Sequence, residues 1–325
     1  MRRRDFIAAI AGATMLPFAV RAQERVRRVG VLMHTRSEEP EAQARLAAFL
    51  QGLQEAGWSV GRNVQIETRW SVGDTARLRK DAAELVALGP DVIVAGVGAT
   101  TLALQEASRT VPIVFAQGLD PVGSDQIVSL ARPGTNATGF TQFEYGLSAK
   151  WLELLKEIAP QVTRVGVLRE PGAAGIGQWA IIQAAASSLG VELSPIGLRD
   201  AAGIERALTS FARDPKGGLV VAVSSASQLH RELIVTLAAR HQLPAVYPYR
   251  FFVSHGGLIS YGPDLVGLYR RAAGYVDRVL KGEKPSDLPV QSATKYELAI
   301  NLKTAKALGL TVPLILQQRA DEVME

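Results

Sequence analysis

The chain contains no cysteine in its 325 residues. Disulfide bonds, thiolate chemistry and a lipid anchor on cysteine are therefore excluded. Common catalytic signatures are missing as well, since no G-x-S-x-G elbow, Walker A loop or H-E-x-x-H motif occurs. The four histidines, His34, His230, His241 and His255, lack the spacing of metal ligands. We therefore expect no metal, no cofactor and no enzymatic activity.

Excess charge is also small outside the N-terminal segment. The formal net charge is +5, but residues 1–22 hold four arginines against one aspartate, so the remaining chain carries +2. This balance gives no indication of nucleic-acid binding. Residues 1–22 have the pattern of a secretory signal peptide, because Arg2, Arg3 and Arg4 precede a short apolar stretch and cleavage fits near Ala22. The Arg3-Arg4 pair also matches a twin-arginine signal, so either export route fits, and we expect a periplasmic protein.

The chain instead contains a long internal repeat. Three apolar segments of the first half return in the same order in the second half, offset by about 127 to 136 positions. The paired segments are 28–32 with 164–168, 91–99 with 218–226, and 111–115 with 243–247. A period this long is too large for a solenoid unit and predicts two similar lobes. A cleft between such lobes is a preferred ligand site.

Each lobe shows alternating strand and helix patterns. Short β-branched runs that end at Gly, Ser or Pro loops alternate with amphipathic helices, which predicts an α/β fold of two doubly wound parallel sheets. We expect a hinge of several segments between the lobes. The predicted organisation is residues 28–140 plus 256–288 for lobe 1 and 141–255 plus 289–325 for lobe 2. Within it, the strand at 258–261 and the helix at 265–280 return to lobe 1, and 285–289 crosses to lobe 2.

Loops after the central strands are candidate ligand contacts, because ligands of open α/β sheets bind at the carboxyl ends of the strands. In lobe 1, Gly98, Ala99 and Thr100 begin a helix whose amides can hold a carboxylate. In lobe 2, Ser224 and Ser225 occupy the matching loop. The alternative is that these hydroxyls only cap helices.

Further candidates follow the next strands. Gln117 and Asp120 follow the strand at 112–115, where Asp120 either holds a ligand amine or forms a turn with the proline after it. Tyr247 and Arg250 occupy the matching loop of lobe 2, where they either contact a ligand or belong to the core and the surface. Tyr261 is either a hinge residue or a wall of the cleft.

Several segments resemble a known family over the region from residue 28 to the C-terminus. The matching segments are 57–64, 120–122, 130–139, 258–263 and 301–310. With them the chain resembles the ABC-transporter substrate-binding proteins of the tryptophan/tyrosine type. The resemblance implies a type I periplasmic-binding-protein fold and delivery of a small solute to a membrane permease. The loop 96–99 has Val97 where the family commonly has Thr or Ser, which favours contacts through backbone amides.

The leading hypothesis is an exported, monomeric solute-binding protein of an ABC importer. It would capture an amino acid, aromatic or not, or a related carboxylate in the cleft, and hinge closure would deliver it to a permease in the inner membrane. An aromatic solute would need walls such as Phe115, Tyr247 and Tyr261. The alternatives are a two-lobed enzyme such as an isomerase, a periplasmic ligand sensor, and a cytosolic regulator, which would need a DNA-binding segment before Arg28.

Overall fold

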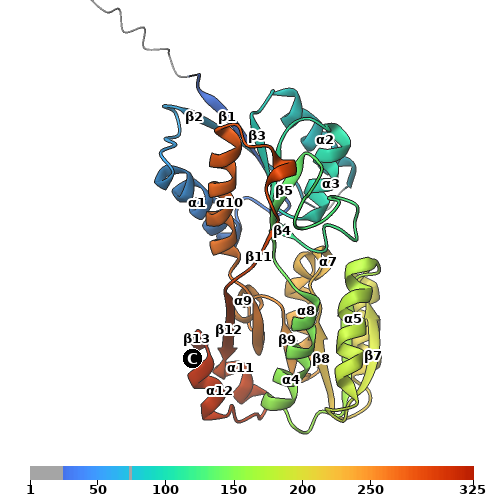
Figure 1. The fold of residues 1–325 in the computed structure, drawn as a ribbon. Helices are drawn as coiled ribbons and strands as arrows, with labels where there is room; N and C mark the ends of the chain where they lie inside the picture. The colour runs from blue at the N-terminus through green and yellow to red at the C-terminus, as the bar shows by residue number, and fades with distance from the viewer. Residues whose placement is uncertain (1–24, 73–74) are drawn as a thin grey trace, which may run out of the picture.

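The computed structural model describes residues 25–72 and 75–325, so the predicted signal peptide at 1–22 lies outside the described residues. The chain forms two α/β lobes, one above the other in Figure 1, and each is built on one sheet. This confirms the predicted fold class. Within the described residues, no helix is long and apolar enough to cross a membrane.

The first sheet has six strands in the order β11-β5-β4-β3-β1-β2, and every pairing is parallel. Its strands are β1 (Arg27–Met33), β2 (Val64–Trp70), β3 (Val92–Ala95), β4 (Ile113–Gly118), β5 (Ala137–Thr141) and β11 (Gln291–Ser292). Its helices are α1 (Pro40–Glu55), α2 (Thr75–Ala87), α3 (Gly98–Ala107), α10 (Leu265–Leu280) and the 3-10 turn η2 (Pro285–Asp287). α1 packs with α10 on one face, and α2 packs with α3 on the other (Figure 1).

The second sheet has seven strands in the order β13-β12-β10-β9-β8-β6-β7. Its strands are β6 (Arg164–Arg169), β7 (Glu192–Gly197), β8 (Gly217–Val221), β9 (Ala245–Tyr247), β10 (Ile259–Pro263), β12 (Tyr296–Asn301) and β13 (Glu322–Met324). Only the β10–β12 pairing is antiparallel among the described strands. Its longer helices are α4 (Ser148–Ile158), α5 (Ala173–Ala186), α6 (Ala201–Phe211) and α8 (Arg231–Arg240). Its shorter helices are η1 (Tyr145–Leu147), α7 (Ser225–Leu229), α9 (Arg250–Ser254), α11 (Leu302–Ala307) and α12 (Leu314–Arg319).

The sequence repeat is a structural repeat. The order β4-β3-β1-β2 in the first sheet matches β9-β8-β6-β7 in the second. Even the glycine of the repeated Arg-Val-Gly-Val-Leu segment has the same role in both lobes. A Cβ on Gly30 would lie 3.0 Å from Leu85, and one on Gly166 would lie 2.7 Å from Ile196. A side chain at either position would therefore disturb the packing over the central strand.

The chain crosses between the lobes at three places: 142–144, near Asp264, and 293–295. The prediction that the strand at 258–261 belongs to lobe 1 is wrong. β10 instead pairs with β9 and β12 in the second sheet, where Ile259 is fully buried. The predicted crossing at 285–289 is also too early, because β11 first pairs with β5. Helix α10, by contrast, does return to lobe 1, where it packs on α1.

A ring stack and a hydrogen bond, both made by Trp151, hold the hinge. Phe143, in the first crossing, stacks on Trp151 of α4 with a centroid distance of 5.0 Å. The indole N–H of Trp151 donates a 2.7 Å hydrogen bond to the carbonyl oxygen of Tyr261 in β10. The first crossing is therefore anchored to the strand that precedes the second one.

Candidate ligand-binding site

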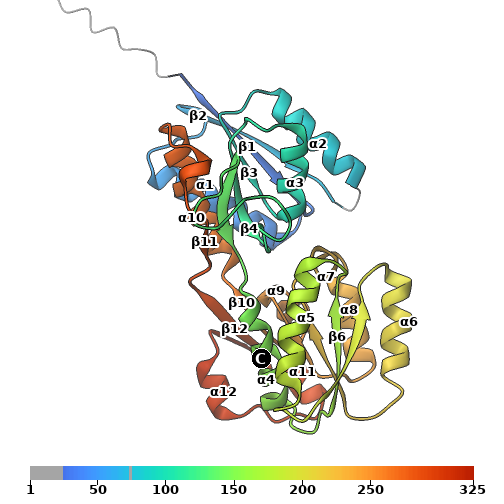
Figure 2. The same ribbon diagram turned by 45° about the vertical axis from the view of Figure 1, so that its right-hand side comes forward.

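The carboxyl ends of the central parallel strands of both sheets face the space between the lobes (Figure 2). Two adjoining compartments line this space. The amide compartment, about 340 Å³, is lined by buried glutamines and the start of α3. The charged compartment, about 330 Å³, is lined mainly by ionisable side chains of 34–45 and 228–233. Val97 from lobe 1 and Ser225 and Gln228 from lobe 2 line both. An occupant of either compartment would therefore contact both lobes.

The N-terminus of α3 supplies backbone donors to the amide compartment. Gly98 and Ala99 line it, and their amides have no acceptor within the described part of the chain. Thr100 is fully buried, and its hydroxyl both donates to the Val97 carbonyl oxygen at 2.6 Å and accepts from the Val97 amide. The Thr100 side chain therefore holds the turn, while the preceding amides face the compartment with the positive end of the helix dipole.

The serines of lobe 2 combine both sequence interpretations. The hydroxyl of Ser224 accepts a hydrogen bond from the Ser227 amide at 3.0 Å, so it caps α7. Ser224 nevertheless lines the amide compartment, and Ser225 lines both compartments. Ser225 is thus the serine whose hydroxyl remains open to a ligand.

Asp120 is both a turn residue and a wall of the amide compartment. Its φ is +55°, and its carboxylate accepts the Gly123 amide at 2.9 Å and the Tyr145 hydroxyl at 2.7 Å. Burial and this contact with Asp120 raise the pKa of Tyr145, so the hydroxyl stays a donor. The carboxylate is therefore fixed in direction and keeps lone pairs for a further donor.

Three buried glutamines give the amide compartment its name. Gln117, Gln126 and Gln142 are all at most 3% exposed. Gln142 accepts the Tyr249 hydroxyl at 2.9 Å. The Gln126 side-chain oxygen and both polar atoms of the Gln117 side chain have no hydrogen-bond partner among the described residues, although Gln117 lies near the Tyr269 hydroxyl. Unpaired polar atoms are costly when buried, so these amides are suited to a hydrogen-bonding ligand.

Sequence reasoning named Gln117 but missed the other two. Gln126 lies in the loop after β4 and Gln142 in the first crossing, and both segments follow strand ends of the first sheet. Their position after the carboxyl ends of strands could have identified both glutamines as candidate ligand contacts.

Besides Thr100, three predicted residues lie outside both compartments. Tyr247 is 1% exposed and stacks on Phe252 at 4.9 Å, and burial raises its pKa. Arg250 pairs with Glu322 of β13. Tyr261 stacks on Tyr296 at 5.9 Å. Their positions correspond to the core, surface and hinge alternatives considered above. Phe115, the remaining candidate for an aromatic wall, is fully buried in the first lobe.

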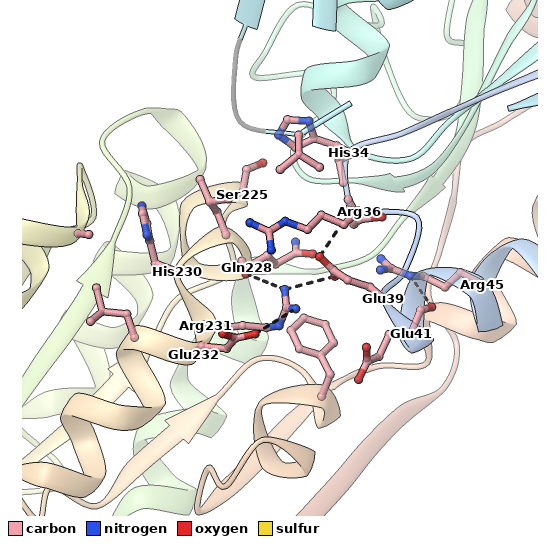
Figure 3. Close-up of a pocket in the computed structure, with 17 residues that line it drawn as sticks. His34, Arg36, Glu39, Glu41, Arg45, Ser225, Gln228, His230, Arg231 and Glu232 are labelled. Atoms are coloured by element: carbon pink, nitrogen blue, oxygen red, sulfur yellow. Dashed lines mark hydrogen bonds and ion pairs between the residues drawn. The ribbon is translucent and has the colours of Figure 1, made fainter. Parts of the chain in front are cut away.

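The charged compartment contains an ion pair between the lobes. Arg231 of α8 lies 3.3 Å from Glu39, which precedes α1, and their side chains are 15% and 18% exposed (Figure 3). His34 and Arg36 line the same compartment. Burial lowers the pKa of His34, which favours its neutral form near pH 7.

The fold and this cleft are those of a solute-binding protein, and the family follows from the sequence match. Residues 30–324 match the model of the ABC transporter substrate binding protein family, and the chain belongs to that family. It is a family of substrate-binding proteins rather than enzymes.

Three known proteins are similar to this chain in sequence or in structure. A tyrosine-binding protein of Clostridioides difficile (strain R20291) is 24% identical over 280 residues, which cover 84% of this chain and 79% of that protein. A Streptococcus pneumonia ABC domain in complex with L-Trp has a TM-score of 0.84 at 25% identity, covering 92% of this chain and 99% of that one. A conserved domain protein from Vibrio cholerae has a TM-score of 0.84 at 28% identity, covering 92% and 100%.

Proposed function

We propose that this protein is the exported solute-binding component of an ABC importer and that it captures an amino acid in the cleft between its lobes. The observation that carries the proposal is the amide compartment, where open α3 amides, a fixed carboxylate and unpaired buried amides from lobe 1 face the serine loop of lobe 2. The tyrosine-binding relative and the neighbour in complex with L-Trp support the amino-acid class.

Each part of an amino acid has a matching group in this compartment. The amides of Gly98 and Ala99 suit the carboxylate, because a helix N-terminus offers aligned donors and positive potential. Asp120 suits the ammonium group, because its carboxylate is fixed by two donors and is still open to the compartment. Ser225 contacts the solute from lobe 2, so the bound solute favours lobe closure by differential affinity for the closed state.

Aromatic solutes fit less well than the relatives' names suggest. No Phe, Tyr or Trp lines the amide compartment in the described structure, and Phe251 is the aromatic residue lining the charged one. Buried aromatic ligands gain much of their affinity from aromatic and apolar walls. We therefore expect a polar amino acid to bind better than tryptophan or tyrosine.

Export, a periplasmic location, monomeric state and delivery to an inner-membrane permease complete the proposal. They rest on the signal-like segment 1–22 and on the role of the family. Export is tested by fractionating cells that express the full chain and locating the protein after cleavage near Ala22.

A thermal-shift screen tests the binding role. The protein from Gln23 onward is unfolded, dialysed and refolded to remove copurified solute, then mixed with all common amino acids and simple carboxylates. A ligand at 100 times its Kd stabilises the folded state by about 2.7 kcal/mol, which raises the Tm by several degrees. No shift with any amino acid would contradict the proposal.

A further inference from the structure

The charged compartment contains a buried arginine with no anionic partner. Arg45 lies on α1 and is 3% exposed, yet it lines the compartment. Its Nε donates a 3.0 Å hydrogen bond to the carbonyl oxygen of Glu41, one turn earlier. Figure 3 shows the guanidinium directed into the compartment from α1. Its two terminal nitrogens have neither a hydrogen-bond acceptor nor an ion-pair partner within residues 25–72 and 75–325.

Neighbouring groups do not compensate this charge. The ring of Tyr269 lies 6.0 Å from the guanidinium carbon, at the outer limit of a cation–π contact. The Tyr249 hydroxyl donates to Gln142 instead. The positive charge of Arg45 nevertheless acts on both phenol groups, since it opposes the rise in pKa that burial causes at Tyr249 and Tyr269.

None of the three acidic residues of the compartment forms an ion pair with Arg45 in the described structure. Glu39 pairs with Arg231 at 3.3 Å. The Glu232 side chain is 76% exposed and lies 3.8 Å from Arg231. The half-buried Glu41 carboxylate forms no ion pair with Arg45 within 4 Å.

A buried cation without a counter-ion is unfavourable, because desolvation costs several kcal/mol and only a paired anion offsets it. Guanidinium also presents a planar set of donors that matches a carboxylate in a bidentate arrangement. These donors point into a compartment that adjoins the proposed amino-acid site. Such an arrangement fits a ligand that brings the missing anion.

We propose that Arg45 binds an acidic group of the solute, so that the cargo carries a second carboxylate beside the one held by α3. This rests on the proposed function and narrows it to the acidic amino acids and related dicarboxylates. The second carboxylate occupies the charged compartment, while the ammonium and the first carboxylate occupy the amide compartment.

The first test uses malonate as the probe, with acetamide as the uncharged comparison, at constant ionic strength. Malonate should raise the Tm of the wild-type protein and of Arg36→Met, whose exposed arginine lines the same compartment. It should leave Arg45→Met unchanged. Without malonate, Arg45→Met should melt no lower than the wild type, because it removes an uncompensated charge. An equal malonate response in all three proteins would overturn the proposal.

The second test compares aspartate with asparagine and glutamate with glutamine. Wild type should bind an acid about 100-fold more tightly than its amide, and Arg45→Met should lose that preference. Preferential binding of a neutral amino acid, with the same Kd in Arg45→Met, would overturn the proposal while leaving the proposed function intact. If no amino acid binds, the proposed function fails, and the malonate comparison still decides whether Arg45 holds an anion.

Discussion

The α3 amides can be tested by one substitution that removes a single N–H group. Gly98 is the first residue of α3, so its amide has no partner within the helix. Proline is favoured at this first helical position. The preceding Val97 already has φ −138° and ψ 171°, the extended conformation that a following proline requires. Gly98→Pro should therefore delete one donor while keeping the helix.

The expected magnitude follows from the bond that is lost. A hydrogen bond to a charged group is worth about 1.5–3 kcal/mol, so Gly98→Pro should weaken solute binding by roughly 10- to 150-fold. Gly98→Ala is the matched control. A Cβ at this position lies 3.2 Å from Nε2 of Gln126, a side-chain end that can move, and both variants share that contact.

Isothermal titration with the amino acid selected by the screen measures the difference between the two variants, and urea unfolding checks the fold. The reasoning is refuted if Gly98→Pro and Gly98→Ala bind with the same Kd while both remain folded. An equal loss in both would mean that the added carbon, and not the amide, disturbs the site.

Four further substitutions probe the ion pair, Gln117 and the hinge. Glu39→Gln and Arg231→Gln should be coupled by about 1 kcal/mol in a double-mutant cycle of solute affinity, because both side chains are largely buried. Purely additive effects on the Kd would exclude a role of this ion pair in closure. Gln117→Met removes unpaired buried polar atoms, so without solute it should raise the free energy of unfolding by about 1 kcal/mol, while it should weaken solute binding. A lower free energy of unfolding for the solute-free variant in urea titrations would contradict this. Trp151→Phe loses the hydrogen bond to Tyr261 and should lower the unfolding free energy by about 1–2 kcal/mol, with an unchanged urea midpoint as the contrary result.

The sequence patterns predicted the sheets well where the strands are apolar and repeated. β10 and β11 were misplaced because neither pattern states which sheet a strand joins. β11 is a two-residue strand with an exposed glutamine, so it has no apolar signal. The predicted lobe boundary fell between residues 255 and 256, just before β10, but the place of β10 is set by its pairing with β9 and with β12, which lies more than 30 residues further along the chain.

Side-chain direction explains the errors in the site. The loops after β3, β4 and β8 could be predicted to face the cleft, and Gly98, Asp120 and Ser225 do line it. Whether a residue at a strand end points to the cleft or to the core changes with one position, and Tyr247 points to the core. The sequence also contained a signal for Arg45 that the prediction did not use: Arg45 lies one turn before Phe49, on the face of α1 that is buried.

The free energy of lobe closure determines how much binding energy the solute must contribute. The Glu39–Arg231 pair links the two lobes, but a partly exposed pair is worth only about 1 kcal/mol. Shifting a two-state equilibrium from 1:99 to 99:1 requires about 5.5 kcal/mol of differential affinity. The solute must supply most of this through groups contributed by both lobes. Ser225 and Gln228, which line both compartments from lobe 2, are therefore the residues through which an occupant anchored on α3 would draw the lobes together.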